Sequence, residues 1–102
     1  MANTFKNYVD SSIGPAGSTV YTVPGGTTSV LIGCNLANRI STQITASVQL
    51  GSTYIVKDAP IPAGSALSVL DGKIIAETTD TISATSSDSD SLDVIISVLE
   101  QS

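Results

Sequence analysis

Hydrophobic and polar residues alternate along most of this chain. The alternation is clearest in residues 30–37, and residues 44–50 repeat it. Because successive side chains of a β-strand point to opposite faces, a period of two predicts strands in both segments. The polar connector between them has hairpin length, so we expect the two strands to be antiparallel neighbours. The core-facing residues expected for the first strand are Val30, Ile32, Cys34 and Leu36.

Seven further short segments have the same strand character, and none has the spacing of an amphipathic helix. Turn residues separate them, and Asp71-Gly72 in particular predicts a tight hairpin, because both positions of a type I′ turn need positive φ. The pattern predicts an all-β fold, a single β-sandwich or jelly roll of eight or nine mostly antiparallel strands. The seven segments are residues 4–9, 18–23, 52–61, 65–70, 73–77, 80–87 and 92–100.

The length of 102 residues suits one domain with one core, spanning residues 1–102. Residues 1–17 alternate and then carry turn residues, so we expect either an N-terminal arm or an edge strand there. Charged residues are only 13% of the chain, against roughly a quarter in typical proteins, and Ser and Thr replace them. Such a surface suits strands and contacts with neighbouring subunits, where a charge would need a partner.

The charge balance argues against nucleic acid as a partner. The net charge is −5, and the four Lys and Arg residues are scattered along the chain. Affinity for DNA or RNA comes mainly from neutralising phosphates with such residues. Residues 1–10 contain no apolar signal-peptide core, and no apolar stretch is long enough to span a bilayer. We therefore expect a chain that folds in a cytosol and has no membrane partner.

The chain contains few of the residues that enzymes usually use for catalysis. The chain has no His, which removes the commonest general base and every histidine triad. Its one cysteine, Cys34, lies in an apolar stretch and is expected to be a small buried side chain. Gly25-Gly26 is followed by a strand pattern without lysine, so it predicts a turn between strands and not a phosphate loop. We expect no enzyme activity and no cofactor.

Two groups of residues remain as candidate sites. Asp88, Asp90 and Asp93 offer carboxylates at a spacing that suits Ca²⁺, with Asp80 expected nearby across a hairpin, but the glycine and glutamate of an EF-hand loop are absent. A solvated hairpin tip is the interpretation we favour over a metal site. The second group comprises large apolar residues on the outer phase of predicted strands, which indicate burial against another subunit in a closed homo-oligomer. They are Ile95, Leu99, Tyr54, Ile55 and Leu31.

Four stretches carry a likeness to a known family: "MANTFKNYV", "VYTVPGGTTSVLIGCNLAN", "YIVKDAPIPAGSALSVLDGKIIAE" and "DVIISVLEQS". Together they resemble small virion structural proteins of tailed bacteriophages, notably those that infect marine cyanobacteria. In that group a Tyr-Thr-Val-Pro-x-Gly turn, an "IPAGS" turn and a closing Val-Leu-Glu strand recur in one β-rich domain. The likeness covers nearly the whole chain, but its motifs are turns and strands without chemistry.

The resemblance implies a phage particle component and does not by itself give a position in the particle. Our leading expectation is a protein made in the host cytoplasm that works on the capsid surface. We expect a capsid decoration or cement protein, a trimer that binds the major capsid protein and stabilises contacts between capsid subunits. A tail, neck or fibre-associated subunit is the alternative within the same class. A carbohydrate- or host-surface-binding module is the alternative from another class, with Tyr54 as its aromatic platform.

Overall fold

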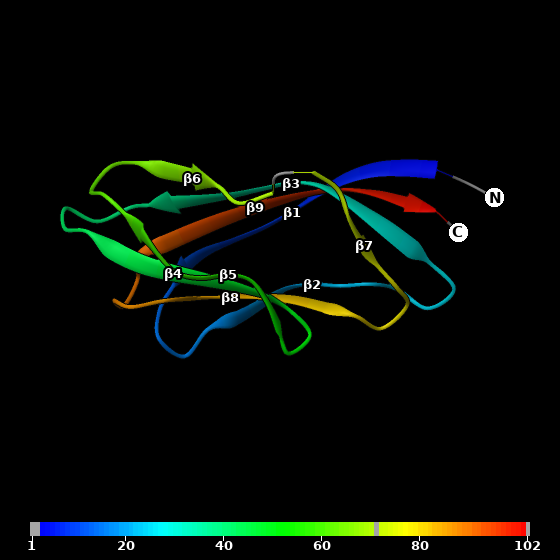
Figure 1. Cartoon of the computed structure of the whole chain (residues 1–102), viewed down its shortest axis with the longest axis horizontal. Helices are drawn as coiled ribbons and strands as arrows, with labels where there is room; N and C mark the ends of the chain where they lie inside the picture. The colour runs from blue at the N-terminus through cyan, green and yellow to red at the C-terminus, as the bar shows by residue number, and fades with distance from the viewer. Residues whose placement is uncertain (1–2, 71, 102) are drawn as a thin grey trace.

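The computed structural model describes residues 3–70 and 72–101 and contains nine strands there, which confirms the all-β fold. The strands form two antiparallel sheets packed face to face in an elongated sandwich, and both chain termini lie at the same end (Figure 1). All nine predicted strand segments are present. The strands are β1 (Asn3–Ile13), β2 (Ser18–Thr22), β3 (Thr28–Asn38), β4 (Ile44–Leu50), β5 (Thr53–Ile61), β6 (Ala66–Ser68), β7 (Ile74–Ala76), β8 (Thr81–Ser86) and β9 (Leu92–Gln101).

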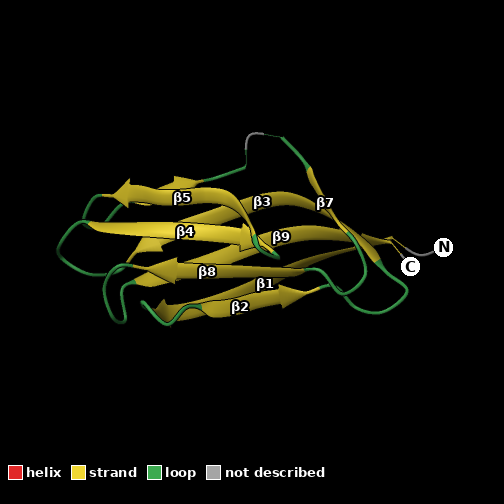
Figure 2. Cartoon of the chain, turned by 60° about the horizontal axis from the view of Figure 1, so that its bottom comes forward, coloured by secondary structure: helices red, strands yellow, loops and turns green. Residues whose placement is uncertain are grey.

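The pairing of the strands is nested. β1 pairs with β9, β2 with β8, β3 with both β6 and β7, and β4 with β5. Sheet I has the order β1-β9-β3-β6, with β7 also on β3, and sheet II has the order β2-β8-β4-β5 (Figure 2). First-with-last nesting of eight strands, with β6 and β7 counted as one interrupted strand, is the arrangement of a jelly roll.

The expected hairpin between residues 30–37 and 44–50 is wrong, because β3 lies in sheet I and β4 in sheet II. The connector crosses from one sheet to the other and is held by the buried side chain of Asn38. Its amide nitrogen donates to the carbonyl oxygens of Thr42, Ile61 and Pro62 at 2.8–3.2 Å, and its oxygen accepts from the Ile40 amide at 3.0 Å. These bonds satisfy backbone groups that the crossing would otherwise leave unpaired.

The expected hairpin at Asp71-Gly72 is also wrong. β6 and β7 do not pair with each other; both run antiparallel to β3, β6 against its C-terminal part and β7 against its N-terminal part. After β6 the amide of Val69 still donates to the carbonyl of Cys34, at 3.0 Å. Gly72 has a φ of 124°, and Asp71 lies outside the described residues. Gly72 thus lies where one edge strand is interrupted between β6 and β7.

A bulge in β3 changes which of its residues face the core. The register with β9 shifts between Leu31 and Gly33, so Ile32 is the extra residue. Leu31 is therefore buried before the bulge and Cys34 after it, whereas Ile32 faces solvent. The expected core phase is correct for Cys34 and Leu36 and wrong for Ile32 and for Val30, which is only partly buried. Burial raises the pKa of the Cys34 thiol to about 11.

The inward-facing residues of β9 form part of the core between the sheets, as the alternation in the sequence predicted. Leu92, Val94, Ile96 and Val98 point inward and are fully buried. The Gly25-Gly26 turn is confirmed as well: the Thr27 amide donates to the Pro24 carbonyl at 3.3 Å. Gly26 has a φ of 71°, which favours glycine at this position of a turn. This turn carries the chain from sheet II to sheet I.

Candidate functional site

The structure does not assemble the acidic candidate site. Asp93 pairs with Arg39, whose Nη1 lies 3.4 Å from Oδ1, and the same oxygen accepts from the Ser12 amide. Asp88 and Asp90 lie in the connector between β8 and β9, which crosses between the sheets and is not a hairpin. Within residues 3–70 and 72–101, no three His, Cys, Asp or Glu side chains gather as a metal site would need.

Asp80 lies elsewhere in the molecule. It precedes β8, whereas the other acidic residues follow that strand, so the length of β8 separates them. Its carboxylate accepts from the Glu77 amide at 2.9 Å, and its amide donates to the Glu77 carbonyl at 2.9 Å. The expectation that Asp80 approaches the cluster is therefore wrong, and its side chain serves a local turn.

A polar cluster joins the two sheets around the buried side chains of Tyr21, Ser29 and Glu100. One carboxylate oxygen of Glu100 accepts from the hydroxyls of Tyr8 (2.7 Å) and Tyr21 (2.6 Å), and the other lies 3.4 Å from the Lys6 ammonium. Tyr21 Oη is also 2.5 Å from Ser29 Oγ, and the two tyrosine rings stack with centroids 4.2 Å apart. Tyr21 belongs to sheet II and the other members to sheet I, so the cluster ties the sheets together.

The electrostatics of this cluster favour a structural role. The hydrogen bond from Tyr21, with smaller contributions from Tyr8 and Lys6, holds the pKa of Glu100 below its usual value although burial opposes this. Burial and the bond to Glu100 raise the pKa of Tyr8 to about 12, and the same causes raise the pKa of Tyr21. Glu100 thus remains an anion and both tyrosines remain neutral donors near neutral pH. Neither Glu100 nor the two tyrosines are poised to exchange a proton at that pH.

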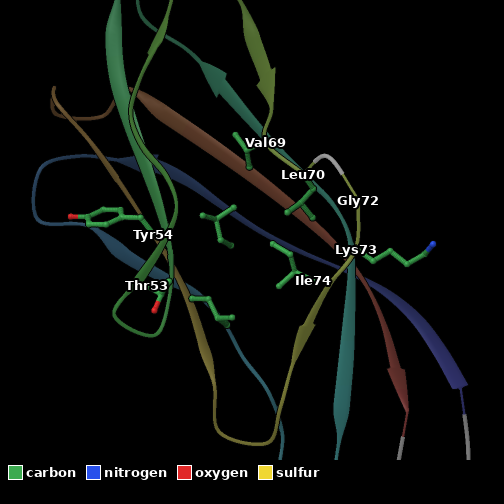
Figure 3. A pocket seen from close by; sticks show the side chains of 9 residues that line it. Thr53, Tyr54, Val69, Leu70, Gly72, Lys73 and Ile74 are labelled. Carbon is green, nitrogen blue, oxygen red and sulfur yellow. The ribbon is translucent and has the colours of Figure 1, made fainter.

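A cavity of about 360 Å³ opens between β5 and the segment that joins β6 to β7 (Figure 3). Leu70 and Ile74 point toward its interior, whereas Tyr54 and Lys73 point away from it (Figure 3). The ring of Tyr54 also carries the Lys57 ammonium 5.3 Å from its centroid. A ligand site needs polar groups that converge on the ligand, and a sugar site needs an open aromatic face. Here the side chains of Tyr54 and Lys73 point away from the cavity, so neither converges on a ligand inside it.

The outer faces of the two sheets differ in chemistry. Across sheet I, four directly opposed outward-facing residues form one apolar row over β1, β9, β3 and β7. Across sheet II, the corresponding row over β2, β8, β4 and β5 has three polar residues and one tyrosine. The apolar row is Phe5, Leu99, Val30 and Ile75, and the polar row is Thr19, Ser83, Gln49 and Tyr54.

The five residues expected at an interface fall into three groups. Ile95 and Leu99 lie on the outer face of sheet I, with Ile95 45% exposed. Tyr54 is exposed on sheet II, and its neighbour Ile55 is partly buried against the core. Leu31 is fully buried in the chain's own core, so its assignment to an interface is wrong. The bulge at Ile32 explains the error, because it reverses the phase of β3.

The sequence pattern missed the most exposed large apolar residues of the described part of the chain. Phe5 is 74% exposed, Val9 67% and Ile75 54%, all on the outer face of sheet I. Each lies in a strand that is recognisable from the sequence. Which of its two faces meets the core depends on pairing with distant strands, and this cannot be read from alternation alone.

No protein-family description and no curated protein matches the sequence. In the part of the chain that the structure describes, no helix is long and apolar enough to cross a membrane. The features that bear on function are therefore the jelly roll, its apolar outer face on sheet I and the polar cluster between the sheets.

Proposed function

We propose that this protein is a structural component of a phage virion, a capsid decoration or cement protein that binds other protein subunits through the outer face of sheet I. The observation that carries the proposal is the apolar row of Phe5, Leu99, Val30 and Ile75 on that face. The jelly-roll fold is compatible, since viral capsid proteins use it, but so do lectins and other proteins. The likeness of the turn and strand motifs to phage virion proteins favours the virion.

The size of the apolar face supports subunit binding. Phe5, Val9, Ile32, Ile75 and Ile95 all have at least two-fifths of their surface exposed. Together they present on the order of 500 Å² of apolar surface, in the upper part of the roughly 300–600 Å² found for the largest patch on a monomer. The largest apolar patch on a monomer is often functional.

The size of this apolar area also predicts that the outer face of sheet I in a single subunit binds weakly. Burying about 500 Å² at roughly 25 cal/mol per Å² contributes about 12 kcal/mol. Association costs about 4–15 kcal/mol in lost freedom, so at most about 8 kcal/mol remains for a single contact. A cement protein overcomes this by occupying many equivalent sites on one shell, where linked contacts add avidity.

In the proposed mechanism, binding of this protein is coupled to the change of the shell from the immature to the expanded state. A subunit that binds the expanded shell and not the immature one stabilises the expanded state by RT ln(1 + [L]/Kd) for each site. The polar outer face of sheet II and the net charge of −5 suit a surface that stays in water and away from DNA. A tail or neck subunit would use the same kind of face on a different partner.

Binding to purified shells tests the proposal. The protein is mixed with expanded and with immature shells of the phage, and the bound fraction is measured after sedimentation. We expect binding to the expanded shells, and Ile75→Asp should abolish it. Ser83→Asp, in the polar row of sheet II, is the matched control and should bind normally. Equal binding to both shell types, or unchanged binding by Ile75→Asp, would refute the proposed mechanism.

A further inference from the structure

The four sheet edges of the sandwich are not equally protected against pairing with another chain. In sheet I the edge formed by β6 and β7 consists of two three-residue pieces. In sheet II, β2 is five residues long and bulged, and β5 carries two bulges and Pro60. Short strands, bulges and proline are the usual devices that prevent edge-to-edge association.

β1 has no proline and no bulge from Asn3 to Asp10, and its one lysine, Lys6, is paired with Glu100 of its own chain. From Asn3 to Asp10 it pairs residue for residue with β9, and its register shifts only between Asp10 and Ile13. Among the described strands only β9 pairs with it, so its other edge is unpaired (Figure 2). Phe5 and Val9 stand on this strand and are the two most exposed large apolar side chains of the described residues.

We infer that β1 pairs with β1 of a second copy of this chain, antiparallel about a two-fold axis, so that the two copies of sheet I form one continuous sheet. Such an interface is self-complementary, because each copy offers the same strand to the other. Main-chain hydrogen bonds would then satisfy the unpaired edge of both copies. This inference concerns the isolated protein and does not depend on the proposed role in a virion.

The side chains select one register. Opposed residues in an antiparallel pair share a face, so the two-fold axis must pass through one residue that pairs with its own copy in the partner subunit. Near the middle of the regular part of β1 this residue can be Lys6, Asn7 or Tyr8. An axis at Lys6 would set two lysines directly opposite each other, which is unfavourable. With the axis at Tyr8, only residues 6–10 of each copy would pair within the regular part of the strand. The axis at Asn7 keeps residues 4–10 paired without like charges directly opposed.

The Asn7 register also covers the exposed apolar side chains. It places Phe5 opposite Val9 of the partner subunit on the outer face, and the symmetry repeats this pair. Aromatic and β-branched residues are favourable cross-strand partners. On the other face Lys6 lies directly opposite Tyr8 of the partner subunit and diagonal to Asp10 of the partner subunit and to Lys6 of the partner subunit. Each Lys6 is also paired with Glu100 of its own chain, 3.4 Å away. The joined outer faces would present two apolar rows side by side, which doubles the surface available to a larger partner.

Charge complementation at residue 7 tests this arrangement. Asn7 is exposed and its side chain only accepts a bond from Ser97, so replacing it leaves folding intact. Asn7→Lys and Asn7→Asp each place like charges together at the axis and should weaken association at least about tenfold. An equimolar mixture of the two variants should recover a dimer with one copy of each. Sedimentation equilibrium gives the masses, and native mass spectrometry gives the composition.

A control separates edge pairing from face-to-face stacking. Asn35→Lys adds the same charge to the outer face of sheet I, on β3 and away from the edge, and should remain a dimer. Loss of the dimer in Asn35→Lys together with failure of the mixture to associate would overturn the inference in favour of stacked faces. A monomeric or three-chain wild-type protein would overturn it as well, the latter in favour of the expected trimer.

Discussion

Replacing Glu100 with glutamine tests the polar cluster that ties the two sheets. In the wild-type protein the Glu100 carboxylate accepts from the hydroxyls of Tyr8 and Tyr21. Net contributions are about 1.5–3 kcal/mol for a hydrogen bond to a charged group and about 0.5–1.5 for a neutral one. Weakening two bonds therefore costs about 2 kcal/mol at pH 7. For a domain of this size, that corresponds to a drop in Tm on the order of 10 °C.

The effect depends on pH with a definite sign. The pKa of Glu100 is lowered in the folded protein, chiefly by the hydrogen bond from Tyr21. The charged carboxylate thus stabilises the fold above the unfolded pKa, and this contribution is lost as the pH falls through the folded pKa. The difference in unfolding free energy between wild type and Glu100→Gln should be largest near neutral pH and should vanish at pH values below the folded pKa of Glu100.

Urea unfolding followed by circular dichroism, at one protein concentration and several pH values, measures both effects. Glu77→Gln is the matched control, because Glu77 is exposed, and it should change stability by less than about 0.5 kcal/mol at every pH. If Glu100→Gln is as stable as the wild type at pH 7, or if the difference does not shrink on acidification, the stabilising role assigned to the cluster is incorrect.

Three further substitutions or probes test the fold and the assignment of faces. The thiol of Cys34 is buried and has a pKa of about 11, so a thiol reagent at pH 8 should label it only after unfolding; fast labelling of the native protein would contradict its place in the core. Asn38→Ala removes the amide that holds the crossing connector and should cost about 2–3 kcal/mol in chemical unfolding, whereas a cost near that of a surface substitution would argue against those bonds. Ile95→Asp should leave the chain folded by circular dichroism while Ile96→Asp unfolds it, and unfolding by both would mean that β9 is buried on both faces.

The strands were predictable because alternation is local. Each segment of Val, Ile, Thr and Ser with a period of two became a strand, and the inward phase of β9 was correct from Leu92 to Val98. The alternation says that a segment is extended but not which sheet it joins. The predicted neighbours β3 and β4 therefore proved to lie in different sheets, and the nested order came only from the structure.

The wrong assignments of Leu31 and Ile32 have one origin. The bulge at Ile32 shifts the phase of β3 by one residue, which exchanges buried and exposed positions. Gly33 in the middle of an apolar strand was the available signal, since glycine inside a strand often marks a bulge. The cluster at Glu100 offered no such signal, because Tyr8 and Tyr21 are separated from it by 92 and 79 residues.

The proposed function is tested most directly by the number of copies of this chain in purified virions, measured by quantitative mass spectrometry against the major capsid protein. A decoration protein that covers the shell should be present in numbers comparable with the major capsid protein and should be found on the head. A copy number as small as that of a tail or neck ring, or absence from the particle, would contradict the account.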